Sequence, residues 1–214
     1  MKKFLIPLLM FAFPVLVSGQ QFPVFSVNLI EIEGKTAAQT EKMKRAAKIF
    51  ERVMNDPEFQ GELRSQTFKS DDDDDLITDP TAEQVIEKIY AAAELYKPEP
   101  NNTADVYWYA KKTGFWRKIT DKCDTIGYGF QGQKSIYTYT CLLDEKDSMA
   151  KLVGHIAHEW SHKLGFTHRD DDDSGIDLTV PYVFGDLVAR HAARWINPDY
   201  ALEENFCPRI YAND

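Results

Sequence analysis

Residues 158–168 read HEWSHKLGFTH, which is the pattern H-E-x-x-H-x-x-G-x-x-H. Side chains four residues apart on a helix lie one above the other, so His158 and His162 can direct two imidazoles at one metal ion. A chain that continued as a helix would carry His168 too far along the axis. Gly165 suits the necessary turn because glycine adopts a left-handed backbone conformation without a Cβ clash. The spacing therefore predicts a helix that ends near Gly165 and three histidine ligands on one metal ion.

Three neutral imidazoles leave one coordination position of a zinc ion for water, which is typical of a catalytic rather than a structural site. Glu159 directly follows the first ligand, and its carboxylate can reach that water instead of the metal. Zinc lowers the pKa of its bound water, and we expect Glu159 to take the proton as the water attacks a carbonyl and to pass it to the leaving amine. The residues thus predict one catalytic Zn2+ ion, with Glu159 as the general base of a secreted zinc-dependent endopeptidase.

Two other functions fit the same residues. One is a secreted zinc-binding interaction protein whose site is occupied but inert. The other is a zinc amidohydrolase that acts on an amide outside ordinary proteins. Bound zinc without cleavage of an unstructured protein, and no effect of Glu159→Ala, would favour the inert site.

The eleven residues of this motif resemble the extended motif of the metzincin clan of zinc endopeptidases. The resemblance implies an α+β fold of the zincin type, with a twisted mixed sheet packed on helices, an active-site helix and a small C-terminal subdomain after the third histidine. It also implies that residues 135–142 form the edge strand, which would pair with an extended peptide substrate.

The chain departs from the clan pattern in one respect, because no methionine follows Met149. The clan has a methionine-containing turn beneath the metal, and residues 178–182 stand at a comparable distance, with Val180 in place of the methionine. Tyr182 resembles the tyrosine that some metzincin families place beside the metal, where it would stabilise an oxyanion as a catalytic residue. Packing is the alternative explanation for Tyr182.

Hydrophobic periodicity and turn residues predict the remaining elements. We expect a strand-like segment over 21–32, helices over 36–55, 80–93, 147–163 and 183–195, and strands over 106–110, 125–129 and 135–142, the last two as a hairpin. This order suggests an α+β layer architecture rather than a repeating βαβ pattern.

The N-terminus has the features of a secretory signal peptide. Lys2 and Lys3 precede a short apolar run over 4–17, and small residues follow at a possible cleavage site near Gly19. We therefore expect residues 1–19 to be removed and the protein to be secreted into an extracellular or periplasmic space. Residues 20–214 would form one metallopeptidase domain, with an upper part over 20–168 and a small lower subdomain over 169–214.

The formal charge of −9 argues against nucleic acid or an anionic membrane as a partner. Without the two lysines of the signal peptide it becomes −11, because 23 basic residues then face 34 acidic ones. No later apolar stretch is long enough to span a bilayer. We expect a polypeptide substrate and a monomeric protein.

Cysteines and aspartate runs suggest further features. Export makes one disulfide plausible, and Cys123 with Cys141 is the preferred pair, which would leave Cys207 as a thiol. The runs 71–75 and 170–173 carry oxygen ligands of the kind that Ca2+ takes, but neither has the spacing of a known calcium loop. Solvated acidic loops are the preferred interpretation. The second run would favour basic substrates if it lies at the mouth of a cleft.

Two further histidines lie outside the motif. His155 precedes His158 by three residues, and packing or capping is preferred there over a fourth ligand or a supporting role beside the metal. His191 is interpreted as a residue of helix packing or of the surface. The aromatic cluster around Tyr107, Trp108 and Tyr109 is interpreted as strand core, with a binding surface as the alternative.

Overall fold

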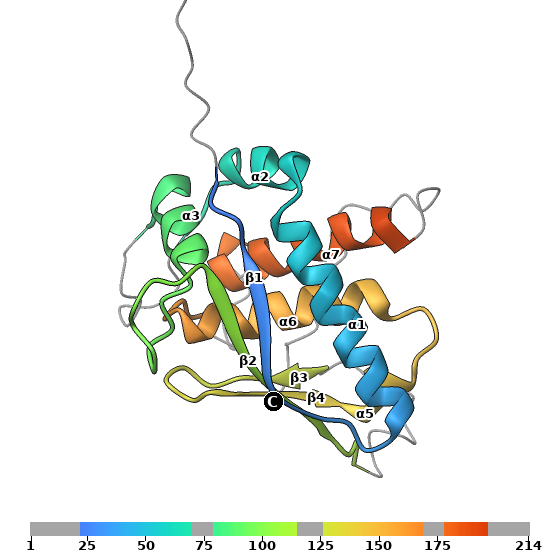
Figure 1. The fold of residues 1–214 in the computed structure, drawn as a ribbon. Helices are drawn as coiled ribbons and strands as arrows, with labels where there is room; N and C mark the ends of the chain where they lie inside the picture. The colour runs from blue at the N-terminus through green and yellow to red at the C-terminus, as the bar shows by residue number, and fades with distance from the viewer. Residues whose placement is uncertain (1–21, 70–78, 115–125, 169–177, 197–214) are drawn as a thin grey trace, which may run out of the picture.

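The computed structural model describes residues 22–69, 79–114, 126–168 and 178–196 (Figure 1). Its elements in chain order are β1 (Ser26–Glu33), α1 (Ala37–Met54), α2 (Pro57–Arg64), α3 (Ala82–Ala91), β2 (Thr103–Lys111), β3 (Gly127–Tyr128), β4 (Ser135–Tyr139), α5 (Thr140–Asp144), α6 (Met149–Lys163) and α7 (Val180–Ile196). Among these residues the strands form one mixed sheet in the order β1-β2-β4-β3. The expected α+β class is confirmed at this level.

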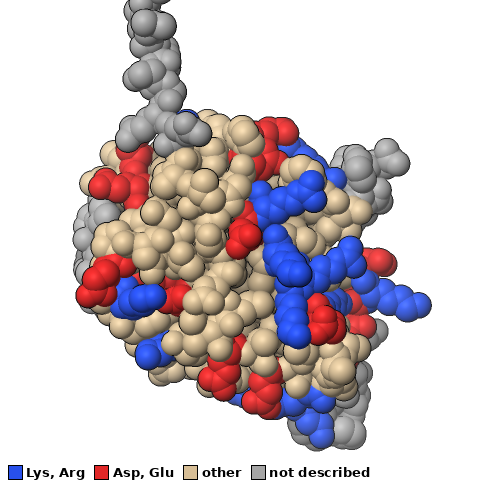
Figure 2. All heavy atoms as spheres, viewed as in Figure 1, with Lys and Arg blue, Asp and Glu red and all other residues tan. Residues whose placement is uncertain are grey.

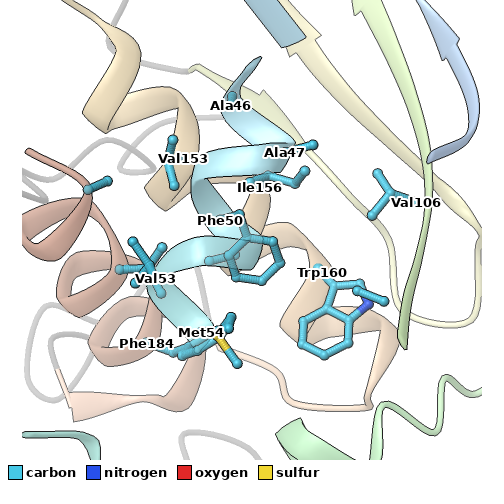
Figure 3. Packing of buried hydrophobic residues seen from close by; sticks show 14 of the residues in the cluster. Ala46, Ala47, Phe50, Val53, Met54, Val106, Val153, Ile156, Trp160 and Phe184 are labelled. Carbon is cyan, nitrogen blue, oxygen red and sulfur yellow. The ribbon is translucent and has the colours of Figure 1, made fainter. Parts of the chain in front are cut away.

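The elements stack in layers around α6 (Figure 1). α1 packs against β1, α6 and α7, and α6 packs against β4 and most extensively against α7. The core fills the space between these elements. Figure 3 shows Phe50 of α1 at its centre, between Trp160 of α6 and Phe184 of α7. The ring of Phe50 meets those of Trp160 and Phe184 edge to face, at centroid distances of 6.0 Å and 6.2 Å. α6 is therefore held on several sides.

α1 follows the expected amphipathic pattern. Four apolar residues spaced three or four apart lie on one face of the helix and are all buried: Met43, Ala47, Phe50 and Met54. Thr36 caps the helix by accepting a hydrogen bond from the Gln39 N–H. α1 ends at Met54, within one residue of the predicted end at 55. Asp56 and Pro57 then begin α2, which the sequence analysis did not anticipate. Proline is favoured at the first helical position, so the same residues that stop one helix start the next.

The expected hairpin is confirmed. β3 pairs antiparallel with β4, with Gly127 opposite Thr138 and Tyr128 opposite Tyr137. The expectation that residues 135–142 form an edge strand is wrong on two counts. β4 ends at Tyr139 and the chain enters helix α5, and β4 lies between β2 and β3 rather than at an edge. Strand propensity predicts that a segment pairs, but its place in the sheet depends on segments far away in sequence.

The segment at 178–182 differs from the expected irregular turn. Thr179 forms a parallel bridge with Lys69, and Val180 already begins α7, three residues before the predicted start. Val180 and Tyr182 are both buried. A helix start therefore takes the place of a free turn in this part of the chain.

Several expectations concern residues outside those that the structure describes. They are the signal peptide over 1–19, the aspartate runs, Cys123 and Cys207. Cys141 is disulfide-bonded, and its partner also lies outside the described residues. In the described part, no helix has both the length and the apolar character required to cross a bilayer.

The surface charge is uneven despite the acidic total. Figure 2 shows Lys and Arg side chains gathered over α1 and the neighbouring end of α7 on one face of the molecule. Arg45, Lys48 and Arg52 are exposed on α1, and Arg52 stacks on the ring of Trp195 at 3.6 Å from its centroid. Net charge alone thus does not describe this face.

Candidate metal centre

α6 carries the candidate site through the middle of the molecule. Every residue from Leu152 to Phe166 is buried, because the sheet, α1 and α7 surround the helix. A helix buried on all sides needs partners for each polar side chain it carries. The buried polar residues of α6 are therefore the candidates for a functional site.

Three imidazoles converge at the end of α6. The ligand atoms of His158, His162 and His168 all lie within 4.8 Å of one another. Nε2 of His158 and Nε2 of His168 are 3.0 Å apart. The ring centroids of the three pairs lie 4.9 to 5.1 Å apart. The structure thus brings together all three predicted ligands.

The return of His168 depends on the turn at Gly165. Gly165 has a φ of 89°, in the left-handed region that the sequence analysis expected. Its N–H donates to His162 O at 3.0 Å, and the Phe166 N–H donates to Ser161 O at 3.3 Å. This pair of bonds is the Schellman arrangement that closes a helix C-terminus around a glycine. The turn reverses the chain and carries His168 back beside His158.

The same turn fixes the orientation of His162. Its Nδ1 lies 2.8 Å from Phe166 O, and a carbonyl oxygen only accepts, so the proton of the neutral ring is on Nδ1. Nε2 then keeps its lone pair for a metal. Burial, followed by the neighbouring His168 and His162, lowers the pKa of His158 well below its ordinary value. A neutral ring is the form that a metal ligand requires.

The donor set fits zinc. Zinc–nitrogen bonds of about 2.0–2.1 Å in a tetrahedral site place two donor nitrogens about 3.3 Å apart. The 3.0 Å between the nitrogens of His158 and His168 is close to that value. Two imidazole nitrogens this close need either a hydrogen bond or a cation between them. Three imidazoles would hold zinc and leave a further coordination position.

Tyr182 lies against two of these ligands. Its ring centroid is 4.9 Å from that of His158 and 4.7 Å from that of His168, and its side chain is buried. The crossing of α6 and α7 places it there. A Cβ on Gly154 would lie 2.7 Å from Gly185 O, so only glycine allows the two helices to approach this closely. The sequence analysis missed this crossing, although a glycine inside a predicted helix is a packing signal.

Glu159 faces the sheet side of α6 and is 2 % exposed. Its Oε1 lies 3.4 Å from Nδ1 of His155, one turn earlier on the helix. Among the described residues, the group of potential metal ligands contains the three histidines and not Glu159. Glu159 thus directly follows the first of the three histidines in sequence but lies outside their group of ligand atoms.

His155 and Lys163 flank Glu159. Nε2 of His155 lies 3.3 Å from Tyr137 O in β4, and burial lowers the pKa of His155 to about 3. The ammonium of Lys163 donates to Phe130 O at 2.9 Å, and burial lowers its pKa to about 8, opposed by Glu159. The sequence analysis missed Lys163. Its spacing of four residues from Glu159, on a helix that is otherwise largely apolar, is the signal that would have found it.

Other predicted residues have structural surroundings. His191 lies on α7, where its ring packs edge to face on Phe59 and its Nε2 contacts Glu62 at 2.9 Å, as expected of helix packing. Trp108 is buried core, with its indole N–H donating to Thr138 Oγ1 at 2.7 Å. Tyr107 and Tyr109 are only partly buried, so the core interpretation holds for Trp108 alone.

Comparison with protein-family models, with curated proteins and with solved structures found no match for this chain, so the inference about its function depends on the geometry of the candidate metal centre.

Proposed function

We propose that the protein is a secreted zinc-dependent endopeptidase of metzincin-like type. The observation that carries the proposal is the convergence of His158, His162 and His168, whose ligand atoms lie within 4.8 Å of one another. The carboxylate of Glu159 directly follows the first of these histidines on the helix. Structural zinc sites have four protein ligands, whereas three leave a position open. The proposed substrate is a polypeptide and the proposed cofactor is one zinc ion.

A bound zinc ion would supply Lewis acidity, which polarises a carbonyl and acidifies water. The chain supplies the proton transfers. Glu159 accepts a proton from the attacking water and delivers it to the leaving nitrogen as the C–N bond breaks, so that the nitrogen departs as a neutral amine and not as an anion. Glu159 is almost completely buried, so its carboxylate is largely withdrawn from bulk water.

Tyr182 is the proposed donor to the oxyanion that forms on the carbonyl oxygen. Its support is the contact of its ring with the rings of His158 and His168, the proposed ligands, because a phenol beside a metal can donate to an oxyanion. Packing against the two imidazoles remains the competing role. Tyr182→Phe separates the two, because it keeps the ring and removes only the hydroxyl.

An inert zinc-binding protein is the second candidate function. The observation that favours it is the burial of the site, since His158 and Glu159 have almost no exposed surface. A substrate must reach the metal for catalysis, whereas a merely structural ion needs no access.

One experiment distinguishes these two functions. The mature protein is purified, its bound zinc is measured, and cleavage of an unstructured protein is followed with and without a chelator. We expect one zinc ion per chain and chelator-sensitive cleavage. Glu159→Gln should retain the zinc and lose roughly 100-fold or more in kcat, the range expected for loss of a general base.

Glu41→Gln is the matched control, because Glu41 is an exposed glutamate on α1. It should cleave like the wild type. Stoichiometric zinc with no cleavage by the wild type would favour the inert protein, and unchanged activity of Glu159→Gln would remove Glu159 as the base.

A further inference from the structure

Three polar residues form a buried ridge along α6. His155, Glu159 and Lys163 are spaced by four residues, so they lie one above the other on a single face of the helix. Each is at most 2 % exposed. We call this set the α6 ridge. Only Glu159 has a role in the proposed chemistry, which leaves two buried polar side chains to be explained.

The hairpin of β3 and β4 lies directly on the α6 ridge. A Cβ on Gly127 would lie 2.4 Å from Nε2 of His155, and a Cβ on Gly129 would lie 2.9 Å from Oε2 of Glu159 and 3.0 Å from Nζ of Lys163. Alternate residues of a strand point to the same side, so the two glycines face α6 and Tyr128 faces away. At Gly127 a Cβ would also lie 2.1 Å from the backbone oxygen of Tyr137, so only glycine fits there, whereas a Cβ at Gly129 would displace the ends of Glu159 and Lys163.

Hydrogen bonds join the two ends of the α6 ridge to this hairpin. Lys163 donates to Phe130 O, just after β3, and His155 contacts Tyr137 O in β4. The charge of Lys163 attracts the Glu159 carboxylate. Nδ1 of His155 lies 3.4 Å from Oε1 of Glu159, but the neutral ring has its proton on Nε2, toward Tyr137 O, so the ring packs beside the carboxylate instead of donating to it from Nδ1. Glu159 therefore lies between an ammonium and a packed imidazole ring, each of which is hydrogen-bonded to the hairpin.

Packing alone does not account for Lys163. A buried ammonium loses its hydration, and an apolar side chain of similar volume would fill the same space without that loss. A glutamate has several rotatable bonds, and a base that transfers protons must be held within about 0.5 Å of its working position. Partners on both sides of the carboxylate provide that restraint.

We propose that Lys163 and His155 are positioning residues, which hold the Glu159 carboxylate in place and fix the β3–β4 hairpin against the metal-binding helix. This inference rests on the proposed function, because it assigns the restraint to a general base. Neither residue touches substrate in this account. Their effect passes through Glu159 and the hairpin.

The test uses Lys163→Met, which keeps an unbranched side chain only one heavy atom shorter and removes the charge. We expect zinc content to remain that of the wild type, kcat to fall about 10- to 100-fold and KM to change little. In a Glu159→Gln background the same substitution should have no further effect on kcat, since residues that act through one group are not additive. Lys48→Met, at an exposed lysine of α1, is the matched control.

A second measurement does not depend on activity. Hydrogen exchange of the backbone amides over 126–139 should be at least several-fold faster in Lys163→Met than in the wild type, in zinc-free and zinc-loaded protein alike. Exchange in α1 should be unchanged. If Lys163→Met does not fold, Lys163→Gln replaces it, because glutamine is polar but uncharged.

The outcomes separate the two proposals. If the wild-type protein binds no zinc, or if it does not cleave the unstructured protein, the proposed function is overturned and the positioning role with it. A wild type that cleaves, with Lys163→Met equal to it in kcat and in hairpin exchange, overturns only the positioning role. Equal losses of kcat in the wild-type and Glu159→Gln backgrounds would also overturn it, because they indicate a general structural effect.

Discussion

Glu94 is a single carboxylate whose protonation is tied to the packing of the metal-binding helix. It is wholly buried, and its Oε1 accepts hydrogen bonds from the indole N–H of Trp160 at 3.1 Å and from the Asp105 N–H at 2.9 Å. Burial raises its pKa, and these two hydrogen bonds oppose the rise. Leu95, the next residue, donates to Lys163 O at 2.8 Å and so satisfies a carbonyl at the end of α6.

We predict that the contribution of Glu94 to the free energy of unfolding decreases as the pH rises. Its pKa in the folded protein lies above the ordinary value of 4.5, so the folded state holds the proton more tightly than the unfolded state does. The stabilisation is complete below pH 4.5 and is lost as the pH passes through the raised pKa. Glu94→Gln should therefore gain stability relative to the wild type with rising pH, by about 1.4 kcal/mol per unit of pKa shift.

Urea unfolding at a series of pH values from 4 to 8 measures this difference. Glu41→Gln should show no growing gap from the wild type, because that carboxylate is exposed. Parallel curves for Glu94→Gln and the wild type would mean that burial does not penalise the charge of Glu94.

A second prediction separates ligand histidines from packing histidines. His168→Ala should weaken zinc binding by more than about 100-fold, because loss of a mere supporting partner already costs 10- to 100-fold. His191→Ala should keep zinc affinity and lower only stability, since His191 packs on Phe59 and contacts Glu62. Titration of the zinc-free proteins with zinc measures both. Equal zinc affinity of His168→Ala and the wild type would remove His168 from the site.

For single residues, the sequence predicted the positions that depend only on spacing along one helix. His158, His162 and Glu159 belong to this group, and Gly165 joins them because its conformation is local. Lys163 and Gly154 were missed because their roles depend on contacts with other elements. Lys163 donates to Phe130 O, and Gly154 lies against Gly185 O.

At the scale of elements, the turn after α6 decides whether the third ligand reaches the other two. A residue with a Cβ is strained at the φ of 89° that Gly165 adopts. We predict that Gly165→Ala lowers the free energy of unfolding by about 1–2 kcal/mol and weakens zinc binding, because the Schellman turn positions both His168 and the carbonyl that orients His162.

Gly61→Ala is the matched control for this change. Gly61 lies within α2, and a Cβ there meets nothing within 4 Å. Alanine at a compatible helical position should stabilise the protein by about 0.4–1 kcal/mol. Chemical denaturation and zinc titration of the two variants give the comparison. A Gly165→Ala protein that is as stable and binds zinc as tightly as the wild type would contradict the role of the turn.

Helices were predicted better than strands. Helical periodicity and caps are local, so α1, α6 and α7 were found within about three residues at each end. α2 was missed because its eight residues leave little room for a periodic pattern. The hairpin was correctly expected, but the place of β4 inside the sheet required its pairing with β2, which is separated from it by a long stretch of chain.

At the scale of the whole molecule, Phe50 joins the helices to the rest of the core. Its ring contacts Phe25 before β1, Trp160 of α6 and Phe184 of α7, and it is completely buried. We predict that Phe50→Ala lowers the free energy of unfolding by about 3–5 kcal/mol through the cavity it leaves.

Ile196→Ala, at a residue that ends α7 and is 37 % exposed, should lower the free energy of unfolding by about 1 kcal/mol or less. Thermal and chemical denaturation measure both variants. A loss for Phe50→Ala as small as that of Ile196→Ala would show that the core does not depend on Phe50.

The sequence by itself determined the parts of the candidate site that follow from spacing within one segment: two imidazoles one turn apart, a carboxylate beside them, and a glycine that lets the chain return with a third imidazole. Only the tertiary structure decided what surrounds them. It set β4 inside the sheet, Tyr182 against the ligands across a glycine crossing, and the hairpin on the α6 ridge. Helical spacing is a property of the chain alone, whereas contacts between distant segments depend on how all the elements pack around one core.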